Sequence, residues 1–298
     1  MKLNRLYFVA IIFAALAVQG CAIADLRTDA LKENSISPSA EERGRSLLKA
    51  SWKAQGMDQL SNFQTYEVIA QDHWKGLLGS MGNVWPVNQK DMRFRFAVNT
   101  FDSQVEVLEG KKKGFIAGQQ SWNYYEKEQG KSIEFKEKPD KRISFGLAAY
   151  QYFFELSNRL MRAPIVVYAG ERNFEGKTYD MVFASWETIE PHKGHDQYRL
   201  WIDRETKLIA FVENTVRENY LPGAQSLYGT TKYSSYQDVA GVKVPFELSV
   251  YLNKPSKKDS RYVHRLSVKT FQFDTFQASE LYPNPKLKNV GDTKLSLP

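Results

Sequence analysis

Cysteine is almost absent from this chain, and its scarcity limits both structure and chemistry. Cys21 is the only cysteine among 298 residues, so packing without an intramolecular disulfide must stabilise the fold. The sequence also lacks the Gly-x-Ser-x-Gly elbow, the phosphate-binding loop and the dinucleotide-binding fingerprint. Its carboxylates are scattered, and no catalytic pair stands out. We therefore expect no enzymatic activity and no cofactor.

Histidine is also scarce, and two of the four histidines share one loop. His192 and His195 lie three residues apart, beside Glu190 and Asp196, between two predicted strands. Such a group can bind a metal ion, so a metal-dependent hydrolase using this pair is kept as an alternative. No His-Glu-x-x-His motif places the two rings on one helix face. The pattern favours a solvated loop without a metal.

A long apolar run occupies the start of the chain. It covers 13 residues, from Leu6 to Val18, and follows the basic segment Met1–Arg5. This length suits the core of a signal peptide and is short for a membrane span. The run ends in Val18-Gln19-Gly20-Cys21, which resembles the bacterial lipobox. The resemblance implies that residues 1–20 are removed and that Cys21 carries diacylglycerol. The alternative is a plain signal peptide cut nearby.

A lipid on Cys21 would attach the protein to a membrane, because each buried CH₂ contributes roughly 0.8 kcal/mol. Ala22 stands where an Asp would resemble inner-membrane retention in two-membrane bacteria. We therefore expect a lipid-anchored protein of the outer membrane that faces the periplasm.

Positive charge is in excess, with a formal net charge of +7 that falls to +5 when Lys2 and Arg5 leave with the signal peptide. Export and the lack of a basic helix argue against nucleic acid as a partner. Attraction to anionic lipid headgroups is the better explanation for the charge.

The mature chain divides into three parts. Residues 21–38 are polar and weakly patterned, which predicts a flexible, lipidated tether. Residues 39–275 carry the helix and strand signals of one domain. Residues 276–298, with three prolines, predict an extended C-terminal tail.

The domain is predicted to begin with a helix and to continue mainly as strands. Ser39-Ala40-Glu41-Glu42 reads as a capping box, and Gly56 suits the end of the helix. Short alternating segments follow, which predict antiparallel hairpins. We predict strands over 63–71, 91–99, 104–108, 114–117, 121–126, 131–136, 165–168, 177–187, 197–202, 207–217, 227–236, 244–252 and 262–273.

The segment 142–162 interrupts the strands with a helix that is apolar over most of its circumference. Its polar residues Ser144, Gln151, Glu155 and Asn158 form one narrow stripe, which predicts burial on several sides. The charges inside the segment argue against a transmembrane span. We predict a mainly β (α+β) fold: a highly curved antiparallel sheet, or half-barrel, with this helix in its concave face and an N-terminal helix.

Four stretches carry a resemblance to a known family. They are residues 53–57, 118–124, 198–203 and, most specifically, the Tyr-x-x-Tyr-x-x-Val-x-Gly-Val-x-x-Pro string of residues 233–245. With them the chain resembles the periplasmic lipoprotein-sorting (LolA/LolB-like) half-barrel superfamily. The resemblance implies a cavity that binds acyl chains or other hydrophobic ligands. The soluble carrier lacks a lipid anchor of its own, so this chain is more similar to the anchored receptor-type or orphan members.

A long connection, residues 73–90, joins the first two predicted strands. It carries Leu77, Leu78 and Met81 with Gly76, Gly79 and Gly82 between or beside them. Two interpretations stay open: a lid or contact surface for a membrane or partner, and a minor cap on the core.

These patterns together predict a non-enzymatic envelope lipoprotein that binds a lipid, an acyl chain or a lipoprotein in the half-barrel. The alternative is an envelope assembly factor, with a protein partner, whose own helix fills the cavity. The side chains expected to line a ligand cavity are large and apolar. They are Trp74, Trp85, Phe94, Phe96, Trp122, Tyr150, Phe153, Phe154 and Leu156.

Replacing Cys21 by Ala should leave the fold intact and release the protein from membranes, because the change removes the only thiol that can take the lipid. Membrane fractionation measures the release, and circular dichroism checks the fold. A Cys21→Ala variant that still fractionates with the outer membrane would contradict the lipobox interpretation.

Overall fold

The structure is a computed structural model that describes residues 23–33, 36–217 and 223–287. Its strands all belong to one sheet. They are β1 (Thr65–Trp74), β2 (Asp91–Ala97), β3 (Ser103–Val107), β4 (Ile116–Gln120), β5 (Asn123–Lys127), β6 (Glu134–Phe135), β7 (Ile165–Phe174), β8 (Lys177–Ser185), β9 (Gln197–Asp203), β10 (Ile209–Thr215), β11 (Tyr228–Val239), β12 (Val242–Leu252) and β13 (His264–Phe273).

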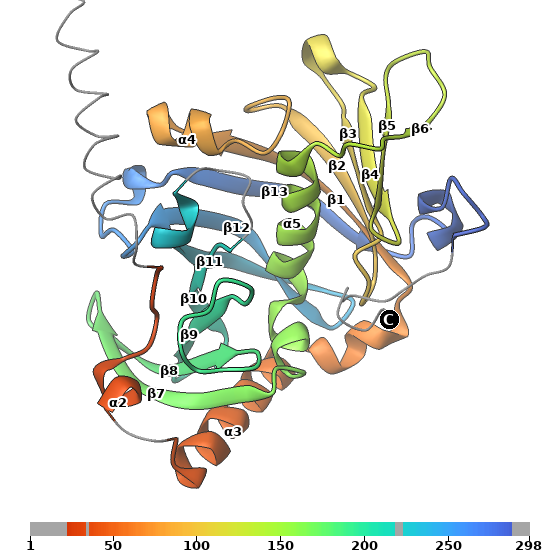
Figure 1. Cartoon of the computed structure of the whole chain (residues 1–298). Helices are drawn as coiled ribbons and strands as arrows, with labels where there is room; N and C mark the ends of the chain where they lie inside the picture. The colour runs from red at the N-terminus through yellow and green to blue at the C-terminus, as the bar shows by residue number, and fades with distance from the viewer. Residues whose placement is uncertain (1–22, 34–35, 218–222, 288–298) are drawn as a thin grey trace, which may run out of the picture.

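The sheet is antiparallel throughout and has 13 strands in the order β6-β5-β4-β3-β2-β1-β13-β12-β11-β10-β9-β8-β7. Its two edges, β6 and β7, are not paired with each other, so the curved sheet is an open half-barrel (Figure 1). The pairing of β1 with β13 joins the first and last strands of the chain in the middle of the sheet. The predicted fold class is confirmed.

Four helices and five short 3₁₀ turns accompany the sheet in the described residues. They are α2 (Asp29–Glu33), α3 (Pro38–Ala54), α4 (Gly76–Gly82), α5 (Lys141–Leu160), η1 (Met57–Asn62), η2 (Gly110–Lys112), η3 (Ala224–Ser226), η4 (Asp259–Arg261) and η5 (Ala278–Leu281). None of the described helices is long and apolar enough to cross a bilayer.

Every predicted strand overlaps an observed one, and the largest difference is at β7. The prediction ended at Tyr168, whereas the strand continues to Phe174. Gly170, with φ of 97°, follows Tyr168 at a break in the pairing register with β8. Beyond this irregularity Glu171 and Arg172 lie on the edge of the sheet, so the apolar alternation that signals a strand is lost there.

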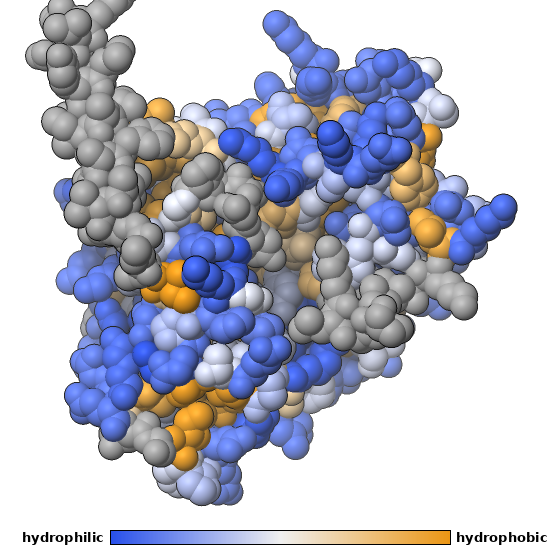
Figure 2. Space-filling view, viewed as in Figure 1, coloured by the Kyte–Doolittle hydropathy of each residue, from blue (hydrophilic) through white to orange (hydrophobic). Residues whose placement is uncertain are grey.

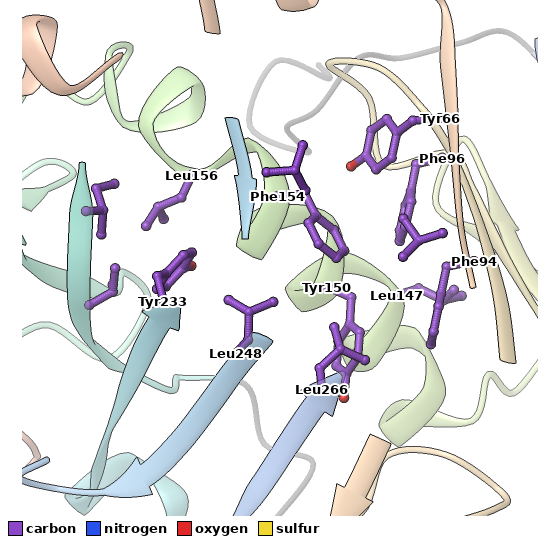
Figure 3. Close-up of a cluster of buried hydrophobic side chains, with 14 of the residues drawn as sticks. Tyr66, Phe94, Phe96, Leu147, Tyr150, Phe154, Leu156, Tyr233, Leu248 and Leu266 are labelled. Carbon is purple, nitrogen blue, oxygen red and sulfur yellow. The ribbon is translucent and has the colours of Figure 1, made fainter. Parts of the chain in front are cut away.

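Helix α5 lies in the concave face of the sheet, as predicted (Figure 1). Asp140 caps its first turn by accepting from the N–H groups of Arg142 and Ile143. One side of the helix packs against aromatic rings of β1 and β2. The ring centroids of Tyr150 and Phe94 are 5.4 Å apart. This contact belongs to the main hydrophobic core (Figure 3).

Helix α3 closes one end of the half-barrel by packing on β7. Its N-cap is Ser37, whose hydroxyl accepts from the Ala40 N–H, with Pro38 as the first helical residue. The predicted capping box at Ser39 was therefore wrong: Pro38 already has helical geometry, and Pro is favoured at that position. A Cβ on Gly44 would lie 2.5 Å from the Val167 carbonyl carbon, so only glycine permits this close approach.

The described part of the predicted tether is bound to the domain. The Leu26 N–H donates to Gln197, and the Leu26 carbonyl accepts from Arg199. Ala24 is held in the same way, by Arg217 and by the Gln225 carbonyl. The prediction of a flexible tether is therefore wrong for residues 23–33, which are bound to the domain.

The N-terminal segment binds here because the convex face of the sheet is apolar. Phe183, Trp201 and Phe211 project from that face, and they form a second core with Leu26 and Leu31. Such a large apolar surface needs cover, and the N-terminal segment provides it. Cys21 and the predicted signal peptide lie outside the described residues.

The C-terminal segment also begins with packed structure. Phe276 and Leu281 are buried and contact Ala97, and Asn284 exchanges hydrogen bonds with Gln120. The predicted extended tail is therefore wrong for its first part, where η5 forms and Phe276, Leu281 and Asn284 contact the domain. Residues 288–298 lie outside the described residues, and the division of the chain into its four segments stays a prediction.

Shortening Leu26 to Ala should lower the free energy of unfolding by about 2–5 kcal/mol, because its side chain is only 1% exposed. Leu77→Ala is the matched control, since Leu77 is 62% exposed and should change stability by less than about 0.5 kcal/mol. Denaturant unfolding of both variants measures the difference. Equal stabilities would show that residues 23–33 do not hold the convex face.

Candidate functional site: a cavity beside helix α5

A cavity of about 850 Å³ lies between α5 and the concave face of strands β9–β11. Turns of the N-terminal half of the sheet, carrying Phe101 and Trp122, complete its wall. Its apolar lining includes Phe101, Trp122, Phe145, Ala148, Ala149, Tyr152, Phe153, Leu156, Trp186, Tyr198, Val212 and Tyr233. Polar lining groups include Gln119, Lys141, Ser144, Arg159, Arg162, His195, Asp196, Asn214, Thr215 and Thr231.

The cavity exists because α5 has two apolar sides and only one of them is covered by the sheet. Leu147, Tyr150 and Phe154 face the N-terminal strands and are buried. Phe145 and Tyr152 belong to the other side, where they line the cavity and remain partly exposed. Figure 3 shows Tyr150 and Phe154 on the side of Phe94 and Phe96, with Leu156 directed toward Tyr233. The helix therefore fills one part of the hollow and leaves the other open.

The predicted ligand residues fall into two groups that α5 separates. Trp122, Phe153 and Leu156 line the cavity. The other six pack into the core and do not line it: Trp74, Trp85, Phe94, Phe96, Tyr150 and Phe154. Alternating apolar residues indicate that a side chain is buried, but they do not indicate which side of α5 it meets. The prediction that these six residues line the ligand cavity is therefore corrected: they belong to the core.

Six aromatic residues of the cavity were missing from the predicted set: Phe101, Phe145, Tyr152, Trp186, Tyr198 and Tyr233. The rings of Tyr152 and Tyr198 are stacked with centroids 5.8 Å apart, and Trp186 lies edge-on to Tyr198. Tyr233 contributes a third strand position. Tyr198 and Tyr233 each begin one of the stretches that carry the family resemblance. Their place in those stretches was the one signal in the sequence that pointed to these two residues, although it did not specify the direction of their side chains.

A buried ion pair crosses the wall of the cavity. Arg159 donates to Glu155 at 2.8 Å, and both side chains are at most 2% exposed. Arg159 also donates to the Thr100 carbonyl, and its guanidinium lies 4.1 Å from the centroid of the Phe101 ring. The pair places one cation at the cavity surface with its charge balanced from within the core.

The middle of the polar stripe of α5 is turned into the protein. Gln151 and Glu155 are fully buried, and Gln151 donates both to Glu155 and to the Ala97 carbonyl. Glu155 also accepts from the Tyr66 hydroxyl at 3.1 Å. These bonds connect the middle of the stripe to β1 and to the turn after β2, and they fix the rotation of the helix about its axis.

Two tyrosine hydroxyls near the helix stay neutral at ordinary pH. Burial raises the pKa of Tyr233 well above its usual value. Burial and the nearby Glu155 carboxylate do the same to the pKa of Tyr66. The buried floor of the cavity beside Tyr233 therefore carries no phenolate.

The His192–His195 loop lies at the edge of the cavity and is held by local contacts. The two rings stack with centroids 5.0 Å apart, and His195 Nε2 lies 2.9 Å from a Glu187 oxygen. His192 Nδ1 accepts from the Gly194 N–H. Across residues 23–33, 36–217 and 223–287, no cluster of three His, Cys, Asp or Glu side chains is arranged to hold a metal ion. Nothing in this geometry favours the hydrolase alternative.

The long connection after β1 caps the core, as one of its two interpretations predicted, and the lid or contact surface stays a prediction. Trp74, Val84 and Trp85 are buried and cap the core. Trp74 is fixed because its indole N–H donates to the buried Asp72, which also accepts from the Tyr150 hydroxyl. By contrast, the apolar side chains of α4 are exposed: Leu77, Leu78 and Met81.

Comparisons with known proteins give likenesses of structure alone. No family model matches the chain, and no curated protein sequence matches it. The chain is similar to a DUF1329 family protein from Desulfovibrio piger (11% identity, TM-score 0.47), covering 81% of this chain and 97% of that one. It is similar to an outer membrane lipoprotein-sorting protein domain from Vibrio parahaemolyticus (8%, TM-score 0.48; 81% and 97% covered). A LolA superfamily protein from Nitrosomonas europaea is also similar (10%, TM-score 0.46; 82% and 99% covered).

Replacing Glu155 by Gln should destabilise the protein by about 3–5 kcal/mol, because the buried guanidinium of Arg159 would lose the carboxylate that it contacts at 2.8 Å. Glu205→Gln, on the exposed turn between β9 and β10, is the matched control and should be neutral within about 0.5 kcal/mol. Urea unfolding measures both values. Similar stabilities for the two variants would rule out the structural role of the pair.

Proposed function

We propose that this chain is a membrane-anchored envelope lipoprotein that binds a lipid or an acyl chain in the cavity beside α5, without catalysing a reaction. The observation that carries the proposal is the partly exposed apolar lining of that cavity. Its volume of about 850 Å³ lies within the range of roughly 300–1,000 Å³ that small-molecule sites occupy.

The chemistry of the lining suits an amphiphile. Phe145, Tyr152 and Phe153 are partly exposed, so covering them with a hydrocarbon chain removes apolar surface from water. Each CH₂ buried in this way contributes about 0.8 kcal/mol. Lys141 and Arg162 are exposed residues of the cavity lining, where they suit a polar or anionic headgroup.

The location of the protein follows from the start of the chain. A lipid on Cys21 would attach the domain to a membrane, and Ala22 suits sorting to the outer membrane. Facing the periplasm, the half-barrel would meet lipids or acylated proteins of the envelope. The absence of recognisable catalytic motifs from the sequence supports a binding role.

The alternative of a self-filled half-barrel is less well supported. Helix α5 does fill the space against β1 and β2, with Leu147 and Phe154 fully packed. It leaves the space in front of Tyr198 and Tyr233 open. A helix that plugged the half-barrel completely would leave no cavity lined by aromatic residues beside it.

Blocking the cavity should weaken ligand binding. Ala148 is a partly exposed residue of the lining, so Ala148→Trp places an indole inside the cavity without removing a core side chain. We expect it to bind fluorescent fatty acids at least about tenfold more weakly, which corresponds to 1.4 kcal/mol. The matched control is Glu42→Trp on the exposed side of α3, which should bind like the unchanged chain.

Lipid mass spectrometry of the gently isolated protein complements this binding measurement. The expected result is a non-covalent lipid in addition to the covalent modification. A protein that carries only the covalent lipid and binds no fluorescent fatty acid would contradict the proposed function. A stable protein partner crosslinked to a lipid-free chain would favour the assembly-factor alternative.

A further inference from the structure

Helix α4 is oriented with Gly79 and Gly82 toward the protein and its large apolar side chains toward solvent. A Cβ on Gly79 would lie 2.8 Å from the Val263 carbonyl oxygen, so glycine is needed for the helix to lie this close to β13. Leu77, Leu78 and Met81 are 62%, 54% and 37% exposed. This arrangement is the reverse of an ordinary surface helix, whose apolar side faces the core.

A basic loop lies beside α4. It connects β12 to β13 and carries four exposed cationic residues: Lys254, Lys257, Lys258 and Arg261. Contacts to the base of α4 hold the loop in place. Lys75 Nζ donates to the Ser260 carbonyl at 2.8 Å, and the Tyr262 hydroxyl lies 2.8 Å from His73 Nδ1. Leu252, 41% exposed, adds another apolar side chain next to the loop.

The N-terminal segment lies along the same rim of the sheet. Because neighbouring strands are antiparallel, β12 and β10 end on this rim, and β13, β11 and β9 begin there. The Ala24 N–H donates to the Gln225 carbonyl, just before β11, and the Asn253 N–H donates to the Tyr228 carbonyl. Figure 1 shows α4 and the start of the described chain on the same side of the molecule, and Figure 2 shows apolar atoms at the surface over α4.

We propose that α4, Leu252 and the basic loop 253–262 form a docking rim that binds the surface of an anionic lipid bilayer. Leu77, Leu78 and Met81 would enter the headgroup region, and the loop lysines would contact the anionic headgroups. The charge complementarity between this loop and an anionic bilayer favours a lipid surface over a protein partner. The inference goes beyond the proposed ligand binding and does not require it.

The position of Ala24 supports a lipid surface independently. If Cys21 carries lipid, Ala24 lies three positions after the anchored residue, and three extended residues span at most about 11 Å. Ala24 is fixed to the domain by two hydrogen bonds. The anchor would therefore hold the rim close to the bilayer. The cavity residues Trp186 and Thr215 lie at the same ends of β8 and β10, so docking would turn this end of the cavity toward the lipid.

A fluorescent probe can measure the docking. Leu78→Cys gives one reactive thiol in the full-length protein isolated with lipid on Cys21, and mass spectrometry verifies the labelling site. On vesicles of phosphatidylcholine and phosphatidylglycerol, an environment-sensitive label at residue 78 should shift to shorter wavelength and be quenched by spin-labelled lipid. Glu205→Cys, exposed on the opposite rim, is the matched control and should show neither effect.

Charge reversal tests the basic loop separately. Lys257→Glu with Lys258→Glu should abolish the shift of the residue 78 label on phosphatidylglycerol vesicles, whereas Lys243→Glu on the opposite rim should leave it unchanged. High salt should act like the double reversal, because it screens exposed charges.

Two results would overturn the docking rim. One is a label at residue 78 that stays as accessible to aqueous iodide as the label at residue 205. The other is a label that becomes protected only when another envelope protein is added, which would assign α4 to a protein contact. Fatty-acid binding is measured independently, so either result leaves the proposed cavity function to be judged on its own data.

Discussion

The packing of α5 against the aromatic rings of β1 and β2 is the contact on which the rest of the structure depends. A strongly curved sheet has a concave face that must be covered, and Tyr150 and Phe154 cover the part formed by Phe94 and Phe96. The buried bonds of Glu155 to Tyr66 and Arg159 fix the rotation of the helix. Because that rotation is fixed, the second apolar side of α5 faces β9–β11 and creates the cavity.

The outer face of the sheet imposes a second constraint. Trp201 and Phe211 project from the side opposite α5 and would be exposed without the N-terminal segment. Arg199 connects the sheet to the N-terminal segment. It pairs with the buried Glu213 within the sheet and donates to the Leu26 carbonyl. The segment that begins two residues after Cys21, the proposed site of the lipid, is therefore also part of the second core.

Much of the fold was predictable because strand and helix periods are local properties. Phe94, Phe96 and Val98 alternate with arginines, and β2 forms where this alternation predicts it. The nearly continuous apolar character of residues 142–162 predicted a helix surrounded by protein. The site was less predictable. Trp122 and Leu156 were expected in the cavity and line it, whereas Phe94 and Tyr150 belong to the packed side of α5.

The sequence by itself determined the succession of the strands and of α3 and α5 along the chain, the burial of α5 and the lipobox-like signal at Cys21, because each depends on residues close together in the chain. Only the tertiary structure decided which side of α5 stays open, that residues 23–33 cover the convex face, and that α4 turns Gly79 and Gly82 inward. These features depend on contacts such as Leu26 with Gln197 and Gly79 with Val263, which join residues far apart in sequence. A pattern indicates that a side chain needs a partner, and the fold decides which partner it meets.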